Sequence, residues 1–268
     1  MNTIFPLIWN EALIRPIKNL LVLFYKFSES LGLPGPLGFA IILLTIAIRL
    51  LIWPLMHQQM KSAKKMSDLK PHLDTLNAKH KDDKKALQQA QLDLYKEHGV
   101  NPAAGCLPTL LQFPILIALY NVFNETFGAD LVRYVTELNE KVIYFPWMKL
   151  TTLDLNFLGI NLGIKPGEWQ KYGWWLLAIP LITGGLQFVQ SRLMMPKSSK
   201  TDEKALAVAG EKVEKKEDMA ADMQKQMMII APIMFGFFSF QLPIGLALYW
   251  NVFGLFGIIQ QLKINKSK

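Results

Sequence analysis

Hydrophobic residues in this chain gather into long uncharged blocks that alternate with charge-dense segments. Residues 36–56 form a block of 21 in which Arg49 is the only charge, 27 uncharged residues precede Glu125, and 20 precede Arg192. At a rise of about 1.5 Å per residue, each block is long enough to cross roughly 30 Å of hydrocarbon as an α-helix. The pattern predicts a polytopic membrane protein.

The last block requires two helices. Between Lys225 and Lys263 lie 37 uncharged residues, which as one helix would extend about 56 Å, too far for a single span. Near its centre stands "FQLPIG", in which Pro243 and Gly245 indicate a turn. The expected fold is therefore an all-α polytopic membrane protein with a bundle of five transmembrane helices. We expect the spans at residues 36–56, 104–124, 172–192, 227–241 and 243–261.

Lysine and arginine are distributed unevenly between the two sides that five spans would define. Segments 57–103, 192–226 and 262–268 carry 20 of them, whereas residues 1–35 and 125–172 carry 8. The positive-inside rule predicts that the first group is cytoplasmic. The expected topology is N-out and C-in, in a bacterial plasma (inner) membrane.

Residues 1–35 show no basic region followed by a small-residue cleavage site, so we expect no signal peptide. Instead, apolar residues recur at helical spacing, which indicates an amphipathic helix on the extracytoplasmic membrane surface. A short sixth span is the alternative, although the uncharged run from Asn19 to Tyr25 is short for one. The apolar positions are Leu13, Ile17, Leu20, Phe24 and Phe27.

Residues 57–103 carry two narrow apolar stripes joined by "HKDDKK", which predicts an antiparallel helical hairpin in the cytoplasm. A loosely ordered loop is the alternative, and Pro71 favours it because proline interrupts a helix. The first stripe is Met66, Leu69, Leu73 and Leu76; the second is Leu87, Ala90 and Leu94. The other expected segments are an extracytoplasmic loop at 125–171, a charged cytoplasmic loop at 193–226 and a cytoplasmic tail at 262–268.

The charged, cysteine and histidine residues exclude some classes of function and indicate no cofactor. The net charge of +8 could suggest nucleic acid, but the basic residues follow the cytoplasmic segments, so we expect no nucleic-acid specificity. The one cysteine, Cys106, lies in an apolar block and has no intrachain disulfide partner. All four histidines lie in 57–103 without metal-ligand spacing, so we expect no metal and no other cofactor.

Polar residues inside the expected spans are the candidate functional site. A central arginine costs about 2.5–3.5 kcal/mol on insertion scales, and Arg49 finds no acidic residue in any span. We therefore expect Arg49 to be solvated in a water-filled cavity lined by amides and hydroxyls; snorkelling to the headgroups is the alternative. The substrate-groove candidates are Arg49, Thr45, Gln112, Thr183, Gln187, Gln190, Trp250 and Asn251.

Three motifs, in order, resemble the YidC/Oxa membrane protein insertases. They are "AIILLTIAIRLLIWPL" (40–55), "KEHGVNPAAGCLPTLLQFPILIALYNVF" (96–123) and "LPIGLALYWNVFGLFGIIQQ" (242–261). The resemblance covers about residues 36–262. We expect the chain to depart from Gram-negative members in lacking their large periplasmic domain, and from many Gram-positive members in lacking their lipoprotein-type signal and cysteine. Its tail after the last expected span, "KINKSK", is short.

The resemblance implies a five-helix bundle around a hydrophilic groove and a cytoplasmic hairpin. It also implies an insertase and folding chaperone for nascent membrane proteins, acting as a monomer, alone or with the Sec translocon. The ribosome and the signal recognition particle pathway are further implied partners. Arg49, Gln187 and Trp250 match the family's groove arginine, glutamine and tryptophan.

Two other classes of protein are alternatives to an insertase. A small-solute transporter or channel would also place polar residues in the membrane, but the chain shows no internal repeat. An enzyme would need a nucleophile with a base, or paired carboxylates, and the spans offer neither. We therefore expect no catalytic residues and no enzymatic activity.

Overall fold

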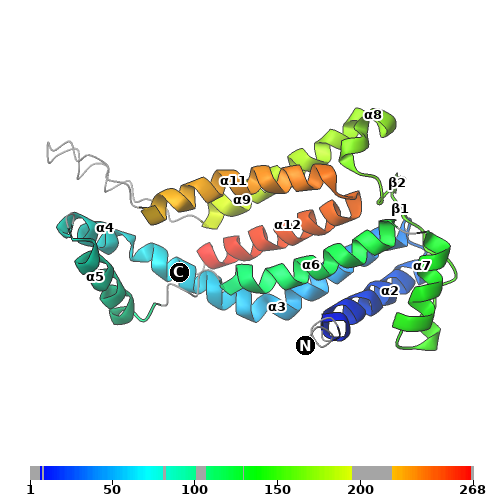
Figure 1. Cartoon of the computed structure of the whole chain (residues 1–268), viewed down its shortest axis with the longest axis horizontal. Helices are drawn as coiled ribbons and strands as arrows, with labels where there is room; N and C mark the ends of the chain where they lie inside the picture. Colours follow the sequence, from blue (N-terminus) through cyan, green and yellow to red (C-terminus); the bar gives the residue numbers. More distant parts are fainter. Residues whose placement is uncertain are drawn as a thin grey trace.

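The computed structural model describes residues 7, 9–80, 83–100, 107–128, 130–194 and 219–266. Its long helices are α2 (Arg15–Ser30), α3 (Pro36–Asp68), α6 (Leu107–Gly128), α9 (Ala178–Met194), α11 (Met219–Gln241) and α12 (Ile244–Lys266). Figure 1 shows α3, α6, α9, α11 and α12 along the long axis of the molecule, with α4 (Lys70–Lys79) and α5 (Lys84–Glu97) at one end. The prediction of a helical protein is confirmed for these elements.

The opposite end is built from short elements (Figure 1). One π-helical turn, Asn10–Ile14, leads into α2. A second, Leu138–Val142, follows α7 (Leu131–Glu137). A small antiparallel hairpin pairs β1 (Asn156–Phe157) with β2 (Ile160–Asn161), which the all-α expectation did not include. The last of these elements are α8 (Trp169–Tyr172) and the 3₁₀ turns Pro146–Met148, Pro166–Glu168 and Trp174–Leu177.

Two helical segments of the described chain are long and apolar enough to cross a bilayer by length and composition. They are Pro36–Ser62, with 27 residues, and Ile244–Ile264, with 21. Met228–Gln241 is a shorter apolar segment within α11. The expected spans 104–124 and 172–192 coincide largely with α6 and α9, but residues 104–106 lie outside the described part of the chain.

The turn between α11 and α12 falls at Leu242 and Pro243, within the motif that indicated it. The first N–H groups of a helix lack partners inside it, so a buried helix start needs acceptors from elsewhere. Here the loop between α6 and α9 supplies them: Ile244 N donates to Ile164 O, and Gly245 N donates to Leu162 O, both at 2.9 Å. These bonds fix the loop against the start of α12.

Helix α2 is amphipathic, but two faces of it are apolar rather than one. Ile17 of the expected stripe is buried in the core that α2 forms with α3 and α6, together with Leu21 and Tyr25. Leu20 and Phe27 of the same stripe remain 37% and 53% exposed. The residues of the expected stripe therefore do not share one environment. Ile17 faces the protein core, whereas Leu20 and Phe27 lie on the outer surface of the molecule.

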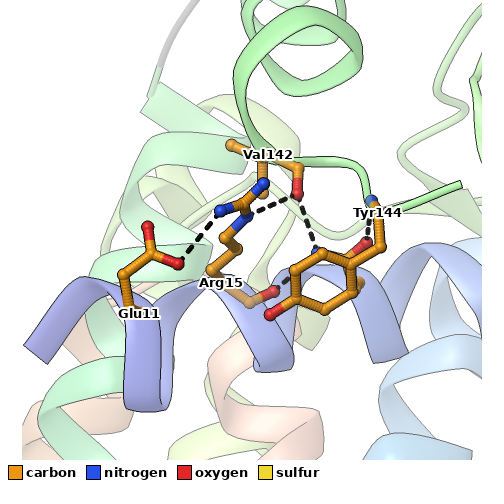
Figure 2. Close-up of polar contacts among 5 residues, drawn as sticks. Glu11, Arg15, Val142 and Tyr144 are labelled. Atoms are coloured by element: carbon orange, nitrogen blue, oxygen red, sulfur yellow. Dashed lines mark hydrogen bonds and ion pairs between the residues drawn. The ribbon is translucent and has the colours of Figure 1, made fainter. Parts of the chain in front are cut away.

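Polar contacts attach α2 to the loop after α7. Arg15 Nε donates to Val142 O at 3.0 Å, its Nη1 pairs with Glu11 at 3.0 Å, and its guanidinium lies 4.9 Å from the centroid of the Tyr144 ring (Figure 2). Buried Asn19 completes the attachment, since it accepts from Tyr144 N and donates to Val142 O. The backbone of this loop therefore finds its hydrogen bonds on α2.

Pro71 does not break the expected helical hairpin. Helix α3 ends at Asp68, and Pro71 lies in the first turn of the next helix, where a missing N–H costs nothing. Asp83 then caps α5 by accepting from Lys85 N and Ala86 N, both at 3.0 Å. The structure thus forms two helices in contact, α4 and α5, rather than the loosely ordered alternative.

Candidate functional site

Arg49 lies in the middle of the helix bundle, where α3 packs against α12. Its side chain is almost completely buried, with 1% exposure. Nη2 donates to the backbone carbonyl of Phe253, and the guanidinium carbon lies 3.4 Å from the centroid of the Phe253 ring. Among the described residues no carboxylate pairs with Arg49. The charge is held by a carbonyl dipole and an aromatic face.

Gly257 makes this arrangement possible. In an α-helix, the side chain of residue i+4 leans back toward the carbonyl of residue i, and Gly257 stands four residues after Phe253. A Cβ at Gly257 would lie 2.9 Å from Arg49 Nη2 and 2.7 Å from Gln190 Nε2. The missing side chain leaves room for both polar groups against the backbone of α12.

Gln190 is the only other predicted site residue that the described contacts bring to this junction with Arg49. It reaches α12 from α9, and its Oε1 would lie 3.7 Å from a Cβ at Gly254. The two glycines on α12 thus form a shallow surface on which side chains from α3 and α9 meet.

The remaining predicted residues are distributed around this junction. Gln112 Nε2 donates to the hydroxyl of Tyr249 at 3.1 Å, which links α6 to α12. Trp250 stacks edge-on against Phe235 of α11, with ring centroids 5.4 Å apart. Asn251 Oδ1 and Trp250 Nε1 are buried without a hydrogen-bond partner in the described part of the chain.

The two threonines and Gln187 do not contact Arg49 in any described interaction. Thr45 is fully buried and donates to Ile41 O of its own helix at 2.6 Å. Thr183 faces α11, where its hydroxyl lies 3.2 Å from that of Ser239, and Gln187 is half-buried. The stripe on α9 therefore meets α11 at one end and α12 at the other.

The water-filled cavity around Arg49 stays a prediction, and the structure adds a backbone partner for Arg49 that the sequence did not indicate. Its Nε and Nη1 are buried without a hydrogen-bond partner among the described residues, and Nη2 bonds to main chain. The long arginine side chain can reach a neighbouring helix, and its delocalised charge tolerates an aromatic face better than an ammonium does. The pattern of polar side chains does not predict this partner. It is a backbone carbonyl, and every residue has one.

Sequence reasoning missed several residues at this junction. Phe253, Tyr249 and Gly257 lie in the third family motif but are neither charged nor amide-bearing. Elsewhere, Ser239, which lies beside Thr183, and the buried Gln260 of α12 were also missed. The spacing of Gly254 and Gly257, three residues apart in an apolar helix, was the available signal, since small residues permit close approach between membrane helices.

No group of three or more histidine, cysteine, aspartate or glutamate side chains in the described residues could hold a metal ion. The rings of His72 and His98 come within 5.8 Å of each other at the base of the α4–α5 hairpin. Cys106 lies outside the described residues.

The long apolar helices and the buried arginine define a helical membrane protein. Residues 29–268 match the family described as 60Kd inner membrane protein. The chain belongs to this family.

Individual relatives agree with this assignment. The chain is 30% identical over 262 residues to the membrane protein insertase YidC of Geotalea daltonii and 32% identical over 256 residues to that of Wolinella succinogenes. These alignments cover 97% and 94% of this chain but 38% and 37% of the relatives, so the chain spans about two fifths of their length.

The fold is also similar to a solved structure. That structure is an active YidC insertase with its first transmembrane domain resolved, with a TM-score of 0.54 and 26% identity. The match covers 97% of this chain and 47% of the other.

Proposed function

We propose that this chain is a membrane protein insertase and folding chaperone for nascent membrane proteins, which it inserts through a hydrophilic groove around Arg49. The observation that carries the proposal is the position of Arg49: a guanidinium buried between apolar helices, held by Phe253 and lacking a carboxylate partner among the described residues. Such a charge is costly in a membrane and is expected where it has a use. The relatives' description as insertases supplies the class of use.

The groove in this proposal comprises Arg49, Thr45, Gln112, Thr183, Gln187, Gln190, Trp250 and Asn251. A hydrophilic flank of the nascent chain enters from the cytoplasm, and its acidic groups are attracted to Arg49. Amides and hydroxyls replace part of its hydration, which shortens the hydrocarbon barrier. The apolar segment then moves into lipid, where burial contributes about 25 cal/mol per Å² and drives the process without nucleotide, cofactor or catalytic residue.

The same proposal includes five spans in the N-out, C-in orientation of a multi-pass protein. In that orientation the α4–α5 hairpin lies in the cytoplasm, where incoming chains arrive. The Sec translocon, the ribosome and the signal recognition particle pathway are the proposed partners. The protein works as a monomer, because one bundle contains all the residues of the groove.

Reconstitution tests the proposal. Purified protein in liposomes should insert a ribosome-free single-span substrate with a short acidic translocated tail, measured by protease protection of that tail. Liposomes without the protein are the control. Equal insertion in both preparations would refute the insertase, and flux of small solutes through the proteoliposomes would instead indicate a transporter or channel.

A further inference from the structure

The arrangement around Arg49 presents a difficulty for any role in binding. A group that attracts a substrate must be reached by it, yet this side chain is 1% exposed, and its Nη2 is engaged by the Phe253 carbonyl. The Phe253 ring covers one face of the guanidinium at 3.4 Å. In this arrangement a carboxylate cannot form the two parallel hydrogen bonds that make arginine–carboxylate pairs strong.

We propose that Gly257 is a positioning residue that holds Arg49 in a latched state on α12, from which an incoming carboxylate releases it. The latch consists of Arg49, Phe253 and Gly257. The proposal rests on the proposed function for the release step, whereas the latch itself stands on the contacts described above.

The geometry at Gly257 supports this role. A Cβ there would lie 2.9 Å from Arg49 Nη2, a distance at which something must shift. Both nearby atoms, Arg49 Nη2 and Gln190 Nε2, are the ends of flexible side chains rather than backbone. A methyl group at 257 would therefore displace the guanidinium and the amide while α3, α9 and α12 remain packed.

The chemistry of release follows from what the guanidinium lacks. Its Nε and Nη1 have no hydrogen-bond partner within the described residues, so the latched state leaves donors unsatisfied at a buried site. A carboxylate offers charge-assisted hydrogen bonds that are shorter and roughly twice as strong as neutral ones. When a carboxylate replaces the neutral carbonyl of Phe253, it satisfies these donors. Arg49 is therefore released from α12 only when an acidic segment is present.

Gly254 provides a matched control on the same helix. It is also buried on α12, but a Cβ there would meet only Gln190 Oε1 at 3.7 Å and Leu186 Cβ at 4.0 Å, which are ordinary contacts. Gly254→Ala and Gly257→Ala add the same methyl group and the same helix propensity, one turn apart. Only Gly257→Ala should disturb the latch.

The experiment measures how accessible Arg49 is to a small arginine-specific dicarbonyl reagent, in the purified full-length protein, by mass spectrometry of the peptide that contains it. We expect Gly257→Ala to raise the modification rate of Arg49 about tenfold over wild type, as for a group whose protecting contacts are removed. Gly254→Ala should leave the rate unchanged. Equal rates in wild type and Gly257→Ala would overturn the latch.

A double-mutant cycle then shows through which side chain Gly257 acts. A Cβ at 257 would meet both Arg49 Nη2 and Gln190 Nε2, so each background relieves only part of the clash. If Gly257 positions Arg49, the shift in thermal unfolding midpoint caused by Gly257→Ala should therefore shrink more in the Arg49→Ala background than in the Gln190→Ala background. The reverse result would assign Gly257 to Gln190 and refute the proposal. If Gly257→Ala fails to accumulate, Phe253→Leu, which keeps the carbonyl but removes the ring, should also raise modification of Arg49; no increase would contradict the latch.

Release is tested separately from insertion. A soluble peptide with an acidic segment should raise the modification rate of Arg49 and leave the rates of other arginines nearly unchanged. A peptide with amides in place of the carboxylates should not raise the rate at Arg49. A wild-type protein that inserts nothing but passes the accessibility and cycle tests would disprove the proposed function and leave the latch standing. Insertion that depends on Arg49 with no effect at Gly257 would disprove only the latch.

Discussion

Burial of the Arg49 charge is costly, and its neighbours offset part of that cost. Its charge is buried, yet the contacts with Phe253 are of kinds that stabilise a cation without a counter-ion. In the proposed mechanism the charge itself is what the substrate meets. The requirement at this position is therefore for a cation that can reach α12, more than for the planar shape of the guanidinium.

Substitution of Arg49 distinguishes these requirements. We expect Arg49→Lys to retain much of the insertion rate, because an ammonium keeps the charge and can donate to the Phe253 carbonyl. Arg49→Ala should slow insertion of acidic-tailed substrates about tenfold, which corresponds to roughly 1.4 kcal/mol in the barrier. Initial rates in proteoliposomes, with acidic-tailed and neutral-tailed substrates side by side, measure both. Equal rates for the two variants on every substrate would remove Arg49 from the mechanism.

Tyr134 is a second buried polar residue, and its role is in stability. It lies in α7, outside the expected spans, with its hydroxyl 2.9 Å from that of Thr126 and the ammonium of Lys18 5.9 Å from its ring centroid. Burial raises the pKa of Tyr134 from 10.0 to about 12. The protonated phenol is therefore the form that the folded state requires.

This raised pKa predicts an alkaline loss of stability. The unfolded chain releases the phenol proton near pH 10 and the folded chain only near pH 12, so the unfolded state binds fewer protons between these values. The contribution is complete below pH 10 and is lost as pH rises toward 12, by roughly 2–3 kcal/mol in the free energy of unfolding. Thermal unfolding in detergent across this range should be less pH-dependent in Tyr134→Phe. An unchanged slope would show that other groups cause the alkaline loss.

At the scale of elements, the contact between α9 and α11 depends on small residues. A Cβ at Gly184 would lie 3.2 Å from the backbone carbonyl of Pro232, and one at Gly236 would lie 3.3 Å from that of Pro180. Neither carbonyl can move without the helix. Between two apolar helices such close approach is a main source of attraction, because lipid competes equally well for larger side chains.

Gly184 and its neighbour Gly185 therefore form a matched pair. Gly185→Ala has open space and should stabilise the protein by up to about 1 kcal/mol through helix propensity. Gly184→Ala gains the same propensity but must push α11 away, so it should be about 1–3 kcal/mol less stable than Gly185→Ala. Unfolding midpoints of the two variants in one detergent measure the difference. Similar midpoints would show that the α9–α11 contact is looser than the structure has it.

The approximate positions of the long helices were predictable because they depend on local chemistry, whereas the ends of α3, α9 and α11 differ from the expected spans. The apolar blocks gave the long helices, and "FQLPIG" gave the turn at Leu242 and Pro243. The rotation of each helix about its own axis was harder to predict from the sequence, because it depends on which helices pack beside it. The same face of α9 meets Ser239 of α11 at Thr183 and α12 at Gln190, so a stripe that looked like one groove wall is shared by two contacts.

The candidate site was predictable only in part for a related reason. Arg49 and Gln190 were identified because charge and amides are conspicuous in apolar segments. Their binding surface on α12 was not, because it consists of a carbonyl, a ring and the absence of a side chain at Gly257. The sequence shows which polar side chains need a hydrogen-bond partner. Which backbone carbonyl lies close enough to be that partner depends on how the helices pack.

At the scale of the whole molecule, the two ends of the bundle differ in construction (Figure 1). One end carries α4 and α5, joined to the bundle chiefly through the long helix α3. The other is closed by a loop whose carbonyls bond to the start of α12 and whose backbone bonds to Asn19. In the proposed function, a substrate enters between the helices from the α4–α5 end, which the proposed orientation places in the cytoplasm.

Single-cysteine labelling in cells tests that orientation. With Cys106 replaced by serine, a cysteine is introduced either at Gln89, exposed on α5, or at Asn156, exposed on β1. A membrane-impermeant maleimide should label position 156 in intact cells, because the segment between α6 and α9 is extracytoplasmic in the N-out, C-in arrangement. Position 89 should be labelled only after permeabilisation, because 20 of the chain's lysines and arginines lie on its side and favour the cytoplasm. Labelling in the opposite order would invert the topology and with it the direction from which Arg49 is approached.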